Sequence, residues 1–182
     1  MTTQTQAQWT LDTAHSEIQF KVKHMMVSTV TGSFKEFEGG VTQVEDTLHN
    51  ANVNFTAKAA SITTNNEQRD GHLQSADFFD TDNNPNVTFD GVLVKVTGAA
   101  EENYKLQGNL TMRGVTKNVE FDAEYFGQAK DPYGNTKAGF EVTGEVNRKE
   151  FGLNWNAALE AGGVLVSEKV KIHINAQLQL IQ

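Results

Sequence analysis

The stretch K-V-K-I-H-I-N-A-Q-L-Q-L, residues 169–180, alternates polar and apolar side chains from end to end. Val170, Ile172 and Ile174 fall on one face, and Lys171 and His173 fall on the other. Successive side chains of a β-strand point to opposite faces, whereas a helix would repeat its apolar positions every three or four residues. The end of the chain is therefore predicted to be a long, half-buried strand.

The same alternation recurs upstream, at residues 16–24, 51–59, 104–112, 119–125 and 138–146. Together with an opening strand at Trp9, about eight strands are expected, which is typical of an all-β barrel or sandwich. Several strands are about ten residues long, and closing them into a ring removes exposed edges. We therefore predict an antiparallel eight-stranded barrel.

The alternation has three short irregularities and one long interruption. Residues 25–30 suggest a helical turn. Phe34 and Phe37 are out of phase, which a β-bulge at residues 35–36 would reconcile. A second bulge is expected at residues 90–91, because the valines that follow have shifted phase.

The longest interruption is T-N-N-E-Q-R-D-G-H-L-Q-S-A-D-F-F-D-T-D-N-N-P-N-V-T-F-D-G, residues 64–91. Thr64 followed by Glu67 fits a capping box and predicts a short helix starting at Thr64. Polar and aromatic side chains mix in this interval, which suits the rim of an apolar cavity or a crossover that plugs the core.

Composition excludes several functions. A net charge of −8 and a pI near 5.1 argue against a nucleic-acid partner, which requires clustered Lys and Arg. The chain has no cysteine, so disulfides, a thiolate nucleophile and Cys-ligated metals are ruled out. No segment reaches the roughly 18 to 20 apolar residues of a membrane-spanning helix.

Catalytic motifs are not found. The sequence has no G-x-S-x-G elbow, phosphate loop or H-E-x-x-H pair, so neither an enzyme nor a cofactor is expected. A metal-dependent enzyme that assembles His15, His24 and His72 in space stays open as an alternative.

The inward faces combine many phenylalanines with small residues such as Ala57, Gly108 and Ala123. An eight-stranded barrel is just wide enough to be filled by side chains or to hold one small ligand. The small residues favour a cavity for a long hydrocarbon chain, and Gly108→Phe is expected to fill it without disturbing the fold. A filled barrel without a ligand is the competing interpretation.

The chain also resembles the YceI-like family of bacterial proteins. The resemblance rests on W-T-L-D-T-A-H-S-E-I-Q-F at 9–20, R-D-G-H-L with D-F-F-D at 69–80, P-N-V-T-F at 85–89, G-N-L-T-M-R-G-V-T at 108–116 and N-R-K-E-F-G at 147–152. It implies a lipocalin-like barrel with a helical insertion near one mouth and a tunnel for the tail of an isoprenoid, of quinone or polyprenyl type. Fatty acid or fatty amide binding is the alternative ligand class.

The predicted ligand-binding residues fall into two groups. Those of the insertion are Arg69, Asp70, His72, Leu73, Phe78 and Phe79. Those of the barrel and its following segment are Phe20, Val22, Phe37, Phe55, Phe89, Leu106, Gly108, Leu110, Met112, Phe121, Phe140 and Trp155.

One domain is expected over residues 9–182, after a disordered segment at 1–8. The first residues carry no basic or apolar run, so a chain that begins at Met1 is expected in the cytoplasm. A chain from which a signal peptide has been removed would be periplasmic. A homodimer stays open.

Overall fold

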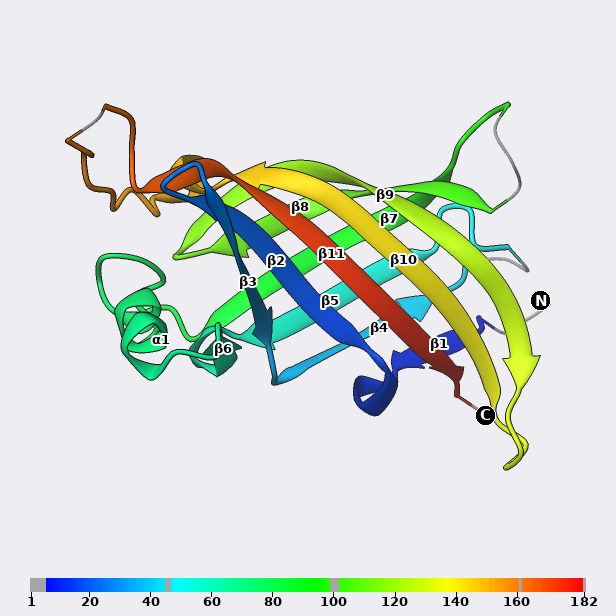
Figure 1. Ribbon diagram of the computed structural model, residues 1–182. Helices are drawn as coiled ribbons and strands as arrows, with labels where there is room; N and C mark the ends of the chain where they lie inside the picture. Colours follow the sequence, from blue (N-terminus) through cyan, green and yellow to red (C-terminus); the bar gives the residue numbers. More distant parts are fainter. Residues whose placement is uncertain (1–5, 45–46, 99–101, 161, 182) are drawn as a thin grey trace.

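A computed structural model describes residues 6–44, 47–98, 102–160 and 162–181 (Figure 1). Its strands are β1 (Gln8–Leu11), β2 (Glu17–His24), β3 (Ser28–Phe34), β4 (Phe37–Thr42), β5 (Asn52–Lys58), β6 (Ile62–Thr63), β7 (Asn86–Lys95), β8 (Asn103–Met112), β9 (Val115–Lys130), β10 (Thr136–Asn147) and β11 (Val166–Leu180). The helices are α1 (Glu67–Gln74) and the short 3-10 turns η1 (Thr13–His15), η2 (Ala59–Ser61) and η3 (Arg148–Phe151).

The strands close into an eight-stranded antiparallel barrel, as predicted. Three of its positions are each filled by two successive strands, β1 with β2, β3 with β4, and β5 with β6. The ring closes where β11 pairs with β1, with Trp9 opposite Leu180 and Leu11 opposite Leu178. Every neighbouring pair is antiparallel, so the barrel leaves no long free edge among the described strands.

Alternation along the strands builds the interior. In β8, Tyr104, Leu106 and Leu110 are buried, whereas Lys105, Gln107 and Asn109 alternate with them on the outer face. Trp9 is buried at the closing seam, and its indole Nε1 donates to Gln43 Oε1 at 3.1 Å. The core is therefore the inside of the barrel.

Neither the helical turn predicted at residues 25–30 nor the bulge predicted at residues 35–36 is present. Residues 25–27 form a hairpin turn, and residues 28–30 already belong to β3, opposite β2. Residues 35–36 are a corner between β3 and β4 rather than a bulge, since the amide of Lys35 donates to Ser61 O at 3.2 Å. Phase alone could not show that the chain changes neighbours at this corner.

The third predicted irregularity, at residues 90–91, is also wrong. β7 pairs with β5 and β8 without any register shift, and Leu93, not Val92, continues the inward face. The one register shift between β9 and β10 lies at Gly139/Phe140, where Phe126 is left on the outside. The three valines after Gly91 misled the prediction, because they alternate on the half-exposed outer face.

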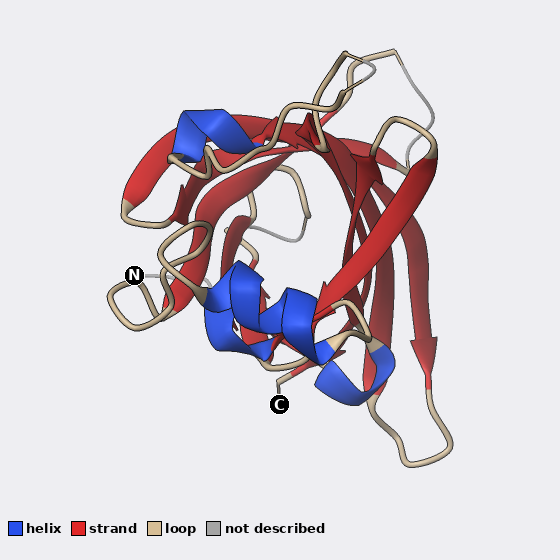
Figure 2. Ribbon diagram, turned by 60° about the vertical axis from the view of Figure 1, so that its left-hand side comes forward, coloured by secondary structure: helices blue, strands red, loops and turns tan. Residues whose placement is uncertain are grey.

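The segment between β6 and β7 forms the helical insertion, which lies across the near end of the barrel in Figure 2. Its helix begins at Glu67, three residues later than predicted, with Asn66 as the N-cap. At the start of the chain, Gln8 is already paired with Thr42, so the barrel begins before residue 9. The rest of the segment predicted to be disordered lies mostly outside the described residues, at 1–5.

Candidate functional site

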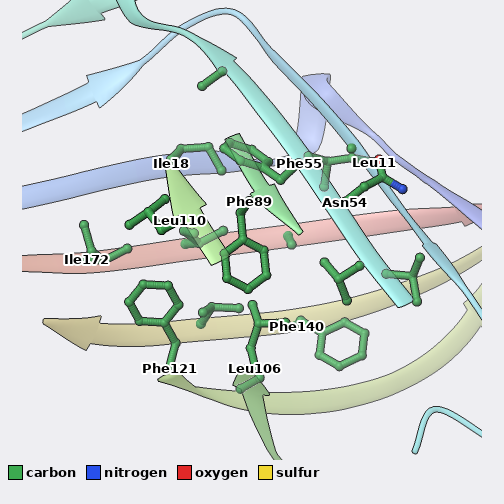
Figure 3. Close-up of a pocket in the computed structure, with 18 of the residues that line it drawn as sticks. Leu11, Ile18, Asn54, Phe55, Phe89, Leu106, Leu110, Phe121, Phe140 and Ile172 are labelled. Carbon is green, nitrogen blue, oxygen red and sulfur yellow. The ribbon is translucent and has the colours of Figure 1, made fainter. Parts of the chain in front are cut away.

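The barrel encloses an apolar cavity. Its volume is about 1120 Å³, including the part open to solvent. Figure 3 shows the rings of Phe89, Phe121 and Phe140 gathered around this space. The lining residues are Leu11, Ile18, Phe34, Gly39, Gly40, Val41, Val53, Asn54, Phe55, Ala57, Val87, Phe89, Leu93, Leu106, Leu110, Met112, Phe121, Ala123, Phe140, Val142, Val146, Ile172, Ile174, Ala176 and Leu178.

The structure places seven of the residues predicted from sequence in this lining. They are Phe55, Phe89, Leu106, Leu110, Met112, Phe121 and Phe140. Residues that the prediction missed, such as Ile18, Val142 and Ile172, lie on the same inward faces. Strand alternation was the signal that could have identified them. Among the described lining residues Asn54 is the only polar one, and none carries a charge.

Gly108 does not contribute free space. A Cβ built on it would collide with Asp90 O and lie 2.5 Å from Gly91 Cα, because β7 and β8 approach each other closely there. Gly108→Phe would therefore disrupt this pairing rather than fill the cavity, contrary to the expectation.

Other glycines on the inward faces are covered by rings of their neighbours. The ring of Phe89 occupies the place of a side chain on Gly91, and the ring of Phe121 does so at Gly144. Such glycines make room for aromatic side chains, not for a ligand. Alanines such as Ala123 do face the open cavity.

Arg69 and Asp70 anchor the helical insertion. Arg69 donates to Thr64 Oγ1 at 2.7 Å through Nε and to Thr64 O at 2.8 Å through Nη2. Asp70 Oδ1 accepts the Thr64 amide at 2.8 Å and its hydroxyl at 2.5 Å. Both side chains thus fasten α1 to the end of β6, and neither lines the cavity.

The side chains of His72, Phe78 and Trp155 form an aromatic cluster at the same end. The His72 ring lies 5.0 Å from that of Phe78 and 4.7 Å from that of Trp155, and the last two are 5.4 Å apart. His72 Nε2 also lies 2.9 Å from a carboxylate oxygen of Asp77. We call the insertion, residues 64–85, together with Trp155 the cap.

A second set of rings joins the cap to the cavity. Phe34, which lines the cavity, lies 6.0 Å from Phe79 and 5.9 Å from Phe20, measured between ring centroids. Phe37 is 6.2 Å from the lining residue Phe55. Three other predicted residues, Phe20, Val22 and Leu73, likewise lie outside the lining. Phe34 is therefore the direct link between cap and cavity.

Two arginines that sequence reasoning did not assign to the site hold the cap in place. Arg113, in the turn between β8 and β9, donates through Nη1 to Ala76 O at 2.6 Å and to Phe78 O. Arg148 is buried and donates to the carbonyls of Leu153 and Trp155.

Burial lowers the pKa of the Arg148 guanidinium, and the charge of Glu168 opposes that shift. Each of the two arginines belongs to a sequence block quoted above, at 108–116 or 147–152. A long side chain inside such a block was the available signal.

The three histidines of the alternative metal site are not brought together. His15 lies in η1, 2.9 Å from an Asp12 oxygen, His24 ends β2, and His72 lies in α1. The described residues contain no group of three or more His, Asp or Glu side chains that could hold a metal ion. The His15 ring contacts a carboxylate of its own turn and neither of the other two histidines.

A closed antiparallel barrel with an apolar interior and a helical cap is a lipocalin-like barrel. The model of the YceI-like domain matches residues 9–178, and the chain therefore belongs to the YceI-like family.

Its relatives include the UPF0312 protein of Staphylococcus epidermidis, which is 41% identical over 170 residues, covering 93% of this chain and 95% of the relative. A solved Campylobacter jejuni YCEI protein is similar with a TM-score of 0.72 and 30% identity, over 88% of this chain and 90% of that one.

A polyisoprenoid binding domain from Saccharophagus degradans is similar in fold, with a TM-score of 0.66 and 14% identity over 94% of this chain and 97% of that one. Within the described residues, no helix is long and apolar enough to cross a membrane.

Proposed function

We propose that this protein binds a long-chain isoprenoid lipid, of quinone or polyprenyl type, inside the barrel and thereby sequesters or transports it. The observation that carries the proposal is the uncharged, almost wholly apolar lining of the cavity. Each methylene that leaves water for such a space contributes about 0.8 kcal/mol before ordering costs are subtracted. No covalent step is needed for this function.

The lining favours an isoprenoid over a fatty acid. A carboxylate drawn into the cavity would find neither a cation nor a row of hydrogen-bond donors among the described lining residues. A fatty acid would have to leave its head group outside, whereas a neutral prenol or quinone would lose much less on entering. The polyisoprenoid binding domain from Saccharophagus degradans, which is similar to this chain in fold, supports the same ligand class.

Native mass spectrometry of protein purified without detergent tests the proposal, followed by organic extraction of whatever is released. A stoichiometric isoprenoid is the expected result. If a stoichiometric acyl compound is released instead, the ligand is a fatty acid or fatty amide and not an isoprenoid. An empty protein that also fails to bind added quinones and polyprenols would contradict ligand binding and favour the filled barrel.

A pair of variants on one strand tests the cavity itself. Ala123 faces the cavity from β9, and Ala129 on the same strand is exposed. Ala123→Phe places a ring in the ligand space and is expected to weaken binding of an added polyprenol about tenfold or more, since that is roughly the effect of displacing two methylenes. Ala129→Phe is the matched control. Equal affinities in two folded variants would contradict binding inside the barrel.

A further inference from the structure

The tip of the β2–β3 hairpin exposes a cluster of apolar side chains. Met26 is 64% exposed and Val27 is 82% exposed, and Met25 and Val164 beside them are 44% and 41% exposed. The amide of Met25 donates to Leu165 O at 2.8 Å, which brings the hairpin and the segment before β11 together. We call Met25, Met26, Val27 and Val164 the apolar tip. Single exposed hydrophobic residues need no explanation, but a cluster at a protruding turn marks an interaction site.

The backbone of the tip is poorly suited to its residues. Met25 has φ 53° and Met26 has φ 60°, both in the left-handed region that Asn and Gly occupy most easily. They are the two central residues of the β-turn that the Val27 amide closes on His24 O at 3.2 Å, and a turn with positive φ at both central positions favours Asn and Gly there. Two methionines are thus kept where they cost stability and contact solvent, and such local cost is found where a residue serves a function other than folding.

Lysines lie directly behind the tip, although the chain as a whole carries a net charge of −8. Lys21 and Lys23 of β2, with Lys169 and Lys171 of β11, are all exposed. Lys23 Nζ donates to Thr29 Oγ1 at 3.0 Å. Within the described ranges none of the four forms an ion pair.

Two of these lysines face each other across the sheet. Lys21 is paired with Lys171, and like charges in this position destabilise a sheet. Glu145, the partner of Lys171 on β10, is the one acidic residue paired with these lysines among the described strands. The positive charge is therefore largely uncompensated within the molecule and is available to an anionic surface.

The turn between β2 and β3, which carries the apolar tip, lies at the same end of the barrel as α1 and the cap (Figure 1). We propose that this end docks on a lipid bilayer that carries anionic head groups, with the apolar tip inserted among the head groups and the four lysines above it neutralising phosphates. An amphipathic surface with apolar residues and adjacent cations is what such an interface selects. Docking in this orientation would present the cap to the membrane from which a lipid ligand would be taken.

Vesicle co-sedimentation tests the apolar part of the surface. The protein is mixed with vesicles of phosphatidylcholine alone or with phosphatidylglycerol added. Wild type is expected to bind the anionic vesicles and to release at high salt. The double variant Met25→Asn, Met26→Gly restores the residues preferred in this turn, so it should fold at least as well while its vesicle affinity falls about tenfold. Tyr133→Ser, an 89% exposed aromatic in the turn between β9 and β10, is the matched control.

A charge reversal tests the lysines. Lys21→Glu places an opposite charge across from Lys171, so its midpoint of thermal unfolding should not fall, whereas its affinity for anionic vesicles should drop about tenfold or more. Opposite directions in stability and binding separate a docking role from a structural one. The proposal is overturned if wild type does not bind anionic vesicles or if the variants bind them as well as wild type does. It is also overturned if the protein binds an acidic protein instead of vesicles.

The experiments use protein stripped of any ligand, so they do not depend on what the cavity holds. Failure of the isoprenoid assignment would leave vesicle binding unchanged. Failure of docking would leave polyprenol binding in solution unchanged, and the two proposals are therefore tested separately.

Discussion

Arg148 shows how one buried side chain can organise a whole segment. Its guanidinium donates to four backbone carbonyls, those of Leu153, Trp155, Val166 and Ser167, at 2.6 to 3.1 Å. It thereby ties the segment that carries Trp155 to the start of β11. Arg69 and Asp70 of the cap act in the same way on Thr64, and Arg113, outside the cap, bonds to the backbone carbonyl of Ala76.

We predict that Arg148→Met will lower the free energy of unfolding by about 3 kcal/mol, because buried carbonyls lose a charged donor. Denaturant unfolding measures the change. Lys149→Met is the control, since Lys149 makes only an exposed ion pair with Glu168 at 3.0 Å and should cost less than about 1 kcal/mol. Equal losses in the two variants would contradict the role given to Arg148.

The N-cap residue of α1 is not the one that local sequence rules predicted. Thr64 and Glu67 have the spacing of a capping box, yet the side chain of Asn66 accepts the Arg69 amide at 2.9 Å. The Thr64 amide is taken instead by Asp70. Asn66 is therefore the N-cap of α1, whereas Thr64 is held by Asp70 at the end of β6.

Asn66→Ala is therefore expected to lower the free energy of unfolding by about 1 kcal/mol, the usual cost of losing an N-cap. Glu67→Ala should change it by less than about 0.5 kcal/mol, because an exposed side chain without a hydrogen-bond partner contributes little. Thermal and denaturant unfolding of both variants would decide the matter. A larger loss of unfolding free energy for Glu67→Ala than for Asn66→Ala would contradict this assignment and favour the capping box.

At the scale of the whole molecule, the barrel depends on the seam where its last strands meet the beginning of the chain. Asp12 lies at this seam, and its Oδ2 accepts from Lys137 Nζ at 2.9 Å and from Gln177 Nε2 at 3.3 Å. The hydrogen bond from Lys137, and next to it that from His15, lower the pKa of Asp12 from 3.8 to about 2, while burial opposes this shift.

Acid should weaken this seam. Because the pKa of Asp12 is lower in the folded than in the unfolded state, its contribution to stability is complete above about pH 4 and is lost as the pH falls toward 2. Asp12→Asn should therefore be less stable than wild type at pH 7, and the difference should shrink between pH 4 and pH 2. Denaturant unfolding of both proteins at pH 7, pH 4 and pH 2 measures this difference, with the exposed Asp82→Asn as control. A difference that stays constant with pH would contradict the role of Asp12.

Several features of this protein could be predicted from its sequence because they depend on neighbours in the chain. Alternation along 169–180 and its counterparts set the strands and their inward faces, and seven of the predicted barrel residues line the cavity. Closure into a ring follows from the number and length of the strands.

Only the tertiary structure shows where the cavity lies, which polar side chains bond to each other and where the lysines gather. Whether an inward small residue leaves a void depends on the side chain across from it, so Ala123 opens the cavity while the Phe121 ring fills the space beside Gly144. The block at 147–152 marks Arg148, but only the folded chain shows that its guanidinium bonds to carbonyls as far away as Ser167. Periodicity is a local property of the chain, whereas cavities, hydrogen bonds and the clustering of lysines behind the apolar tip arise from residues that only folding brings together.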